Sequence, residues 1–436
     1  MEVKDEEKPN SEEERVPGEE INAEEIRETP SEEQTAEAET PAKSDLKKAS
    51  AEEALKNFEG RTIEAPKKKK FGWLGYAFLL VAIGLGIYLM FNIVNDMGEA
   101  KTLGEVLAGA DWVFAVMALA VLLTIIVCEC MKYVIVMRTT TGKFNLRASI
   151  KVAFLGKFYD NVTPFAAGGQ PMQIYYLHKK GYSGGISSAV ILIRYFAQMF
   201  CWTIVSLLLM ACNTTVLQRL GDSAWETVIM VSAWFGLVVN MLLPLMIVLF
   251  AILPKFAHAL VNFVITVGYK IKIVKDKEKA MENAQKVVSD FRAGFRIMAH
   301  KPLNLLLLIV FNLIEVLFSF AFPYFVLRTF SALPEGSGFA VMISVMALNV
   351  YSAQSVTVIP TPGNSGAMEV VVTKAFAAVA SAAVLSWSVL VWRFAVYYIY
   401  IIIGIGLTVF EFIRKIVRAN RKKKAELLNS TTTEDK

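Results

Sequence analysis

Apolar residues in this chain gather in long uninterrupted blocks, unlike the alternating or amphipathic patterns of soluble domains. Six blocks are long enough, and almost free of charge, for a helix to cross about 30 Å of hydrocarbon. They cover residues 71–94, 112–137, 185–212, 227–253, 302–328 and 383–410. The pattern predicts an all-α polytopic integral membrane protein with six full transmembrane helices. It excludes a water-soluble enzyme and a protein held by a single anchor.

Two further apolar segments, 147–177 and 337–380, are interrupted by proline and glycine. Proline removes a backbone donor and disfavours helix in the preceding residue, while glycine permits positive φ. We therefore predict helix breaks at Pro164, Gly168 and Gly169 in the first segment, and at Pro362, Gly363 and Gly366 in the second. Exposed backbone at membrane depth survives only inside protein or beside water. Both segments are thus expected to be re-entrant hairpins next to a binding site.

An arginine follows each broken segment at nearly the same spacing. Arg194 follows Pro164 and Arg393 follows Pro362, and each arginine lies well inside the next apolar block. The order of span, broken hairpin and arginine-bearing span therefore occurs twice, in a first repeat at 112–212 and a second at 302–410. Loop charges place the two hairpins on opposite sides. This predicts an inverted repeat, the architecture of many alternating-access transporters.

The distribution of lysine and arginine predicts that both termini are cytoplasmic. Lysines fill positions 67–70 before the first block, whereas the 95–111 loop has one lysine and four acidic residues. The connector 254–301 is rich in Lys and Arg. It is expected either to be an amphipathic cytoplasmic helix on the inner leaflet or to be a solvated connector. The expected location is a multi-pass position in a cell membrane, of the bacterial plasma-membrane type.

Composition separates the membrane region from two tails. The chain is 55% hydrophobic with a mean hydropathy of +0.45. Residues 1–66 hold many more acidic than basic side chains and a single aromatic one, too little apolar surface to fold. We expect a disordered acidic cytoplasmic tail there, acting as a spacer or as a docking segment. A transmembrane domain at 67–415 and a basic cytoplasmic tail at 416–436 complete the predicted organisation.

The candidate chemistry is that of charges inside a membrane. Arg194 and Arg393 are costly at such a depth, so three interpretations remain open: binding of an anionic group such as a lipid phosphate, structural pairing with carboxylates, and snorkelling to an interface. Glu369 follows the second break, and Glu129 and Glu315 also lie inside spans. Other polar residues, expected either to line the first hairpin or to cap its helices, are Asp160, Asn161 and Gln170. No catalytic residue, metal site, cofactor or direct nucleic-acid binding is expected from the motifs.

The two broken segments resemble the signatures of a known family. GKFYDNVTPFAAGGQP at 156–171 and IPTPGNSGAMEV at 359–370, each followed by an arginine-bearing span, resemble the lysylphosphatidylglycerol synthase transmembrane-region family over about residues 71–415. The family consists of flippase-like integral membrane proteins. Carried over, its functional positions are Pro164, Gly168, Gly169, Arg194, Pro362, Gly363, Gly366, Glu369 and Arg393. This chain has Gln170 where many relatives carry an acidic residue.

The resemblance also implies an activity. The best-known member, the multiple peptide resistance factor, joins such a domain to a transferase that moves lysine from lysyl-tRNA onto phosphatidylglycerol, and the membrane domain carries the product to the outer leaflet. We expect translocation of a charged phospholipid or lipid-linked molecule, so membrane phospholipids are the expected partners. The stretch that follows Phe412 is far too short for a transferase fold, so the enzymatic alternative, phosphatidylglycerol lysyltransferase, is expected to require a separate transferase chain. A secondary transporter of a soluble anion is the third interpretation, and the sequence leaves the oligomeric state open.

Overall fold

The computed structural model describes residues 102–221, 223–270, 276–336 and 338–410, together with the isolated positions 84, 88, 413, 414 and 417. The predicted acidic tail at 1–66 and nearly all of the first predicted span and of the basic tail lie outside the described residues. Within the described ranges the chain forms helices and one isolated β-bridge. An all-α fold, as expected from the long apolar blocks, is confirmed.

Five of the described helices are long and apolar enough to cross a membrane. They are α4 (Trp112–Thr141), α7 (Gly184–Cys212), α8 (Ser223–Ile252), α11 (Pro302–Thr329) and the helix Ala382–Phe410, which contains α14 (Ala382–Arg393) and the π-helical turn η3 (Phe394–Tyr398). At 1.5 Å per residue, such helices reach about 40–45 Å and exceed the hydrocarbon thickness of about 30 Å. Each matches one of the predicted spans from residue 112 onward.

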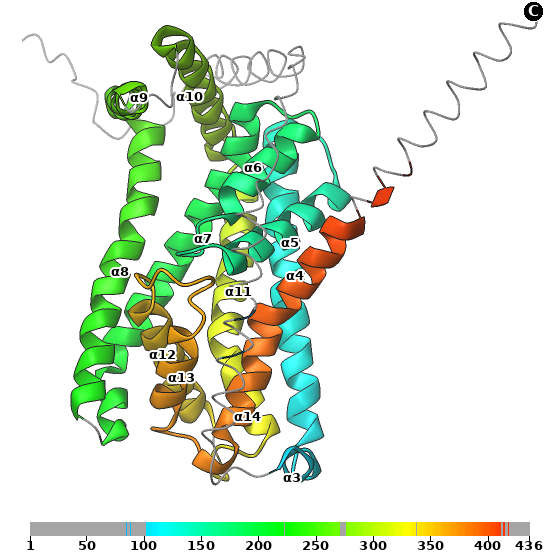
Figure 1. Ribbon diagram of the computed structural model, residues 1–436, viewed down its shortest axis with the longest axis vertical. Helices are drawn as coiled ribbons and strands as arrows, with labels where there is room; N and C mark the ends of the chain where they lie inside the picture. Colours follow the sequence, from blue (N-terminus) through cyan, green and yellow to red (C-terminus); the bar gives the residue numbers. More distant parts are fainter. Residues whose placement is uncertain are drawn as a thin grey trace, which may run out of the picture. The chain divides into compact units, whose positions relative to one another are not determined.

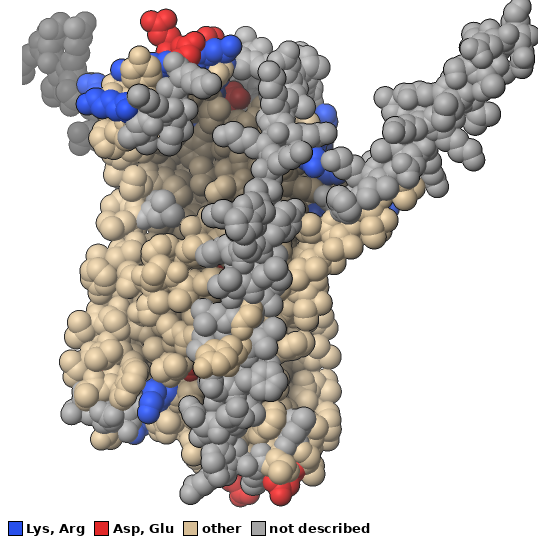
Figure 2. Space-filling view, viewed as in Figure 1, with Lys and Arg blue, Asp and Glu red and all other residues tan. Residues whose placement is uncertain are grey.

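The outer surfaces of these helices suit a lipid environment. Val231, Phe235 and Val238 on α8 are each more than half exposed. Figure 2 shows uncharged surface over the middle of this face, with charged side chains gathered toward its two ends. Apolar surface of this extent is unfavourable in water. The fold is therefore that of a membrane protein.

Four shorter helices form two hairpins. The first hairpin consists of α5 (Leu146–Val162) and α6 (Gly169–Lys179), and the second of α12 (Phe339–Ser355) and α13 (Ala367–Phe376). Figure 1 shows α5 and α6 toward one end of the long helices and α12 and α13 toward the other. The chain reverses in each hairpin within the proline- and glycine-containing segment. We call these two reversals, the first taken together with the last two residues of α5, the hairpin tips: residues 161–168 and 356–366.

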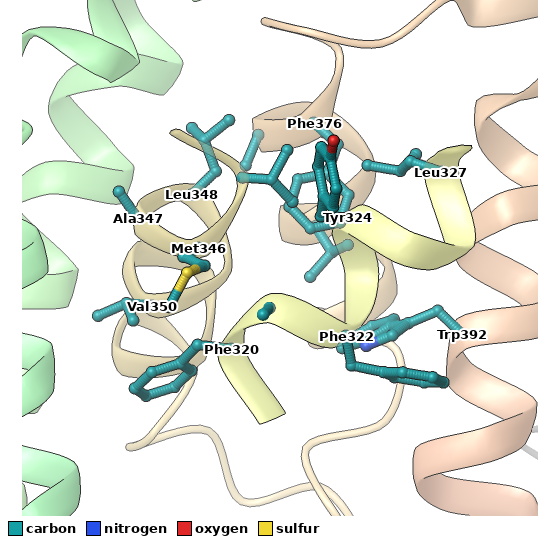
Figure 3. Close-up of a cluster of buried hydrophobic side chains, with 14 of the residues drawn as sticks. Phe320, Phe322, Tyr324, Leu327, Met346, Ala347, Leu348, Val350, Phe376 and Trp392 are labelled. Carbon is teal, nitrogen blue, oxygen red and sulfur yellow. The ribbon is translucent and has the colours of Figure 1, made fainter. Parts of the chain in front are cut away.

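Each hairpin packs into its own apolar cluster. The cluster around the second hairpin is drawn in Figure 3 and includes Phe320, Phe322, Leu348, Phe376 and Trp392. The cluster around the first hairpin includes Tyr133, Ala153, Leu177, Ile191 and Phe291. Because lipid is as apolar as these side chains, the stabilisation comes from close packing more than from leaving water. Glycine permits this close approach, as at Gly404, where a Cβ would meet the ring of Phe158.

The remaining helices connect the spans. Short helices α3 (Leu103–Ala108) and η2 (Thr214–Leu220) precede α4 and α8, and the basic connector forms α9 (Pro254–Lys270) and α10 (Lys277–Ala299). One face of α10 is buried against α7, where Gly294 lies beside Ala189. On α9, Phe263 and Val264 are more than half exposed. This combination of packed and exposed apolar faces fits the amphipathic character read from the sequence.

Candidate functional site

The two hairpin tips lie against each other, although they are far apart in the sequence. Pro164 and Pro362 form an isolated antiparallel β-bridge, and the Gly363 N–H donates to the Thr163 carbonyl at 3.4 Å. Tyr397 joins both tips, because its hydroxyl lies 3.0 Å from the Asn161 carbonyl and 3.3 Å from that of Pro362. The two broken segments therefore make one structural centre.

The backbone at the tips adopts conformations that few residues tolerate. Phe165, Ala166 and Asn364 have φ of 56°, 50° and 55°, and Gly363 has φ of 53°. Left-handed backbone at non-glycine residues costs free energy and persists only where the surroundings impose it. At Gly363 the surroundings are also tight, since a Cβ there would meet the ring of Tyr397 and the backbone of Asn161. Such strain at the junction of two hairpins is typical of a functional centre.

A cavity of 990 Å³ lies beside the tips. Its wall combines charged and polar side chains with large apolar ones from α7, α8 and α9. The charged and polar members include Glu129, Lys157, Asp160, Gln170, Arg194, Gln198, Asn240 and Arg393. The apolar members include Leu192, Met199, Trp202, Met246, Ile247, Phe250 and Leu260. The cavity thus offers both ionic partners and an extensive apolar surface.

Arg194 reaches the cavity from α7 and pairs with a carboxylate of α4. Its Nη2 donates to Glu129 Oε1 at 2.5 Å, and the guanidinium carbon lies 5.0 Å from the ring centre of Tyr133. The residue is 6% exposed, and among the described residues its Nε has no hydrogen-bond partner. A buried guanidinium donor without a partner is costly. The arginine is therefore fixed in position yet retains one unused donor beside the cavity.

Arg393 follows the second hairpin in the chain and is bound to that hairpin. Its Nε donates to Glu369 Oε1 at 2.6 Å, and its Nη2 donates to the Gly363 carbonyl at 3.0 Å. Glu369 in turn accepts the Gly366 N–H at 2.6 Å, which caps the start of α13. The guanidinium also lies 4.2 Å from the ring centre of Tyr397. These contacts fasten the second hairpin to the long helix that carries Arg393.

A buried ionic network that the sequence analysis did not identify lies next to Arg194. Lys132 is fully buried and contacts Glu129 Oε2 at 2.6 Å, as well as Glu315 and Gln198. Lys157 Nζ lies 3.9 Å from Glu315 and is partly exposed to the cavity. A lysine at i+3 from Glu129 inside an apolar block was a readable signal, because residues at this spacing share a helix face.

The polar residues expected in the first hairpin take different positions. Asp160 and Gln170 line the cavity, and Asp160 Oδ1 accepts the Gly169 N–H at 2.8 Å, which caps the start of α6. Asn161 instead donates to the Tyr397 carbonyl at 3.0 Å. Tyr397 was absent from the sequence-based candidates. The structure gives both arginines carboxylate partners, the arrangement of the pairing interpretation, while leaving both in the wall of the cavity.

The described residues offer no metal site, since they contain no group of three His, Cys, Asp or Glu side chains arranged to hold an ion. In the comparison with curated proteins, no match was found. The sequence model of the family described as "Lysylphosphatidylglycerol synthase TM region" matches residues 73–404. That range includes both hairpins, both arginines and the whole cavity wall, and it is most of the chain. The protein belongs to the family of the lysylphosphatidylglycerol synthase TM region.

Proposed function

We propose that this protein moves a charged phospholipid or lipid-linked molecule, such as lysylphosphatidylglycerol, from one membrane leaflet to the other. The observation that carries the proposal is the composition of the cavity, which presents buried charged groups and a broad apolar wall in the same space. Its 990 Å³ is at the upper end of the roughly 300–1,000 Å³ of small-molecule sites. A headgroup fits such a volume, while acyl chains remain along the apolar side.

The charged groups match the chemistry of a headgroup. Arg194 Nε and the Lys157 ammonium are donors suited to a phosphate, and Arg194 is already oriented by Glu129. Asp160, on the same helix α5 as Lys157, suits an ammonium group. Ionisable side chains at membrane depth commonly mark a substrate path. The site therefore supports an aminoacylated or otherwise charged lipid headgroup.

The arrangement of the hairpins supports an alternating mechanism. The first hairpin and the second lie toward opposite ends of the long helices, and their tips meet beside the cavity (Figure 1). With six spans and both termini in the cytoplasm, as the loop charges predict, the segments 112–212 and 302–410 would be inverted repeats. Rocking of one repeat against the other around a fixed site is the common mechanism of such proteins.

Two other functions remain as alternatives. The family description allows phosphatidylglycerol lysyltransferase activity, which would need a partner chain that supplies the transferase. A soluble anion would bind to the arginines and Lys157. It would gain nothing from contact with the apolar wall formed by Met199, Trp202 and Phe250. The extent of that wall favours a lipid.

The test is reconstitution of the full chain in liposomes. The protein should speed exposure of labelled lysylphosphatidylglycerol on the opposite leaflet, and Arg194→Gln should abolish the effect. Arg219→Gln, at an exposed arginine outside the cavity, is the matched control and should be as active as the wild type. Uptake of a soluble phosphate ester without lipid movement would favour the anion transporter. Formation of lysyl-lipid from lysyl-tRNA and phosphatidylglycerol by this chain alone would refute the proposal.

A further inference from the structure

The second helix of each hairpin starts in the same way. At α6 the Gly169 N–H is held by Asp160, and at α13 the Gly366 N–H is held by Glu369. Both carboxylates belong to the hairpin that they cap. A carboxylate at a helix N-terminus is stabilised by the backbone N–H groups and the helix dipole. Asp160 on α5 and Glu369 on α13 are therefore equivalent in this capping role, although they come from different helices of their hairpins.

The arginines break this equivalence. Arg393 Nε is bound to Glu369, whereas Arg194 Nε, the corresponding atom, has no partner among the described residues. Asp160 and Arg194 are opposite charges in the wall of the same cavity, and no hydrogen bond joins them among the described contacts. The second hairpin is thus fastened to its arginine, and the first is not. The cavity wall includes both members of the unfastened pair, together with Arg393.

We propose that Asp160 pairs with Arg194 Nε in the opposite state of the protein, and that the Glu369–Arg393 pair then opens. Asp160 is in this reading a positioning residue that fastens the first hairpin, as Glu369 fastens the second. Its Oδ1 accepts the Gly169 N–H, so its second oxygen can reach the arginine while the cap is kept. Arg194 would also keep Glu129, because that bond uses Nη2.

The contact between the tips explains why the two pairs exclude each other. Pro164 and Pro362 form a bridge, and the Tyr397 hydroxyl binds the carbonyls of both tips. Because the tips are joined, a shift of the first hairpin toward Arg194 pulls the second away from Arg393. Two alternative packings of this kind make a two-state element rather than a continuous deformation. Loss of either pair should then change the populations of the two states in opposite directions.

The test measures which side of the protein is open. In the full chain with the four native cysteines replaced, Ser388→Cys is a reporter, since Ser388 is buried on α14 between Arg393 and the end where the second hairpin lies. Its labelling by a membrane-impermeant thiol reagent from that side reports opening. Asp160→Asn should slow labelling about tenfold, and Glu369→Gln should speed it about tenfold. Asparagine caps a helix as well as aspartate does, so this variant removes the ion pair and keeps the cap.

An unchanged labelling rate in Asp160→Asn would mean that Asp160 is only a cap and would overturn the proposal. A second measurement does not depend on that variant: cysteines at positions 160 and 194 should cross-link faster when Glu369→Gln is present, and equal rates would also overturn it. The inference rests on the proposed function only in requiring access from two sides. Labelling needs no lipid flux. The labelling test can therefore contradict the exchange of ion pairs while lipid movement is still observed. It can also support the exchange when no lipid movement is found.

Discussion

Arg393→Gln should destabilise the protein more than Arg194→Gln, although the two arginines occupy matching positions. Both are at least nine-tenths buried and pair with a buried glutamate. Their glutamates differ. Within the described ranges Glu369 has Arg393 as its paired cation, whereas Glu129 is paired with Lys132 as well as with Arg194.

The expected loss of stability in each variant follows from the contacts that its glutamate keeps. Removing one member of a buried pair costs about 3–5 kcal/mol, because the remaining charge is left uncompensated. After Arg393→Gln, Glu369 keeps its hydrogen bonds to the Gly366 N–H and the Ser365 hydroxyl, but neither group carries a positive charge. The free energy of unfolding is therefore expected to fall by about 4 kcal/mol. After Arg194→Gln, Glu129 keeps Lys132 at 2.6 Å, and the loss should be about 1–2 kcal/mol.

A double-mutant cycle measures this difference. Thermal unfolding of the detergent-purified protein, followed by tryptophan fluorescence, should show a much lower midpoint for Arg393→Gln than for Arg194→Gln. Adding Glu369→Gln to Arg393→Gln should restore most of the loss, with a coupling of about 2–3 kcal/mol, because glutamine can still accept the Gly366 N–H. Equal losses for the two arginines, or a double variant no more stable than Arg393→Gln, would refute the reasoning.

Three further predictions concern the tips, the topology and the cavity. Gly363→Ala should lower the free energy of unfolding by about 1–3 kcal/mol, since φ is 53° and a Cβ would meet the adjoining tip. The control is Gly406→Ala, whose Cβ would meet nothing within 4 Å and which should leave the unfolding midpoint unchanged. Lys180→Cys should be labelled by impermeant reagents only from the cytoplasm and Glu335→Cys only from outside, and labelling of both from one side would contradict the inverted repeat. Lys157→Gln should lower the rate of lipid exposure in liposomes about tenfold at subsaturating lipid, through the loss of one phosphate donor; a rate equal to the wild type would remove Lys157 from the site.

The sequence predicted the local structure of the hairpins because proline and glycine act through the backbone of their own segment. The helices end at Val162 and resume at Gly169 where the break was expected. The sequence also singled out both arginines, which line the cavity in the structure. The ion-pair partners of the two arginines were harder to predict from the sequence. Glu129 and Glu369 were named as carboxylates available for pairing, but which arginine each would meet depends on how α4, α7 and the hairpins pack.

Tyr397 could not have been found in this way. It is one aromatic residue in an apolar block, and its role depends on the π-helical turn Phe394–Tyr398 that directly follows Arg393. A π-turn inserts a residue into the helical repeat and rotates the side chains that follow it. Tyr397 lies within this turn, and its hydroxyl contacts both tips. Long-range contacts of this kind arise from the fold as a whole, and no local pattern encodes them.

The buried charges divide into two groups with different consequences for movement. The first group, Lys132, Glu129, Gln198 and Glu315, connects α4, α7 and α11, none of which belongs to a hairpin, and Lys157 of α5 approaches it at 3.9 Å from Glu315. The Glu369–Arg393 pair instead connects a hairpin with a long helix. Breaking the first group would leave several charges unpaired in the interior, so it resists any change. Exchange of one ion pair for an equivalent one leaves the number of paired charges unchanged, so the proposed exchange would let the hairpins move while α4, α7 and α11 stay fixed.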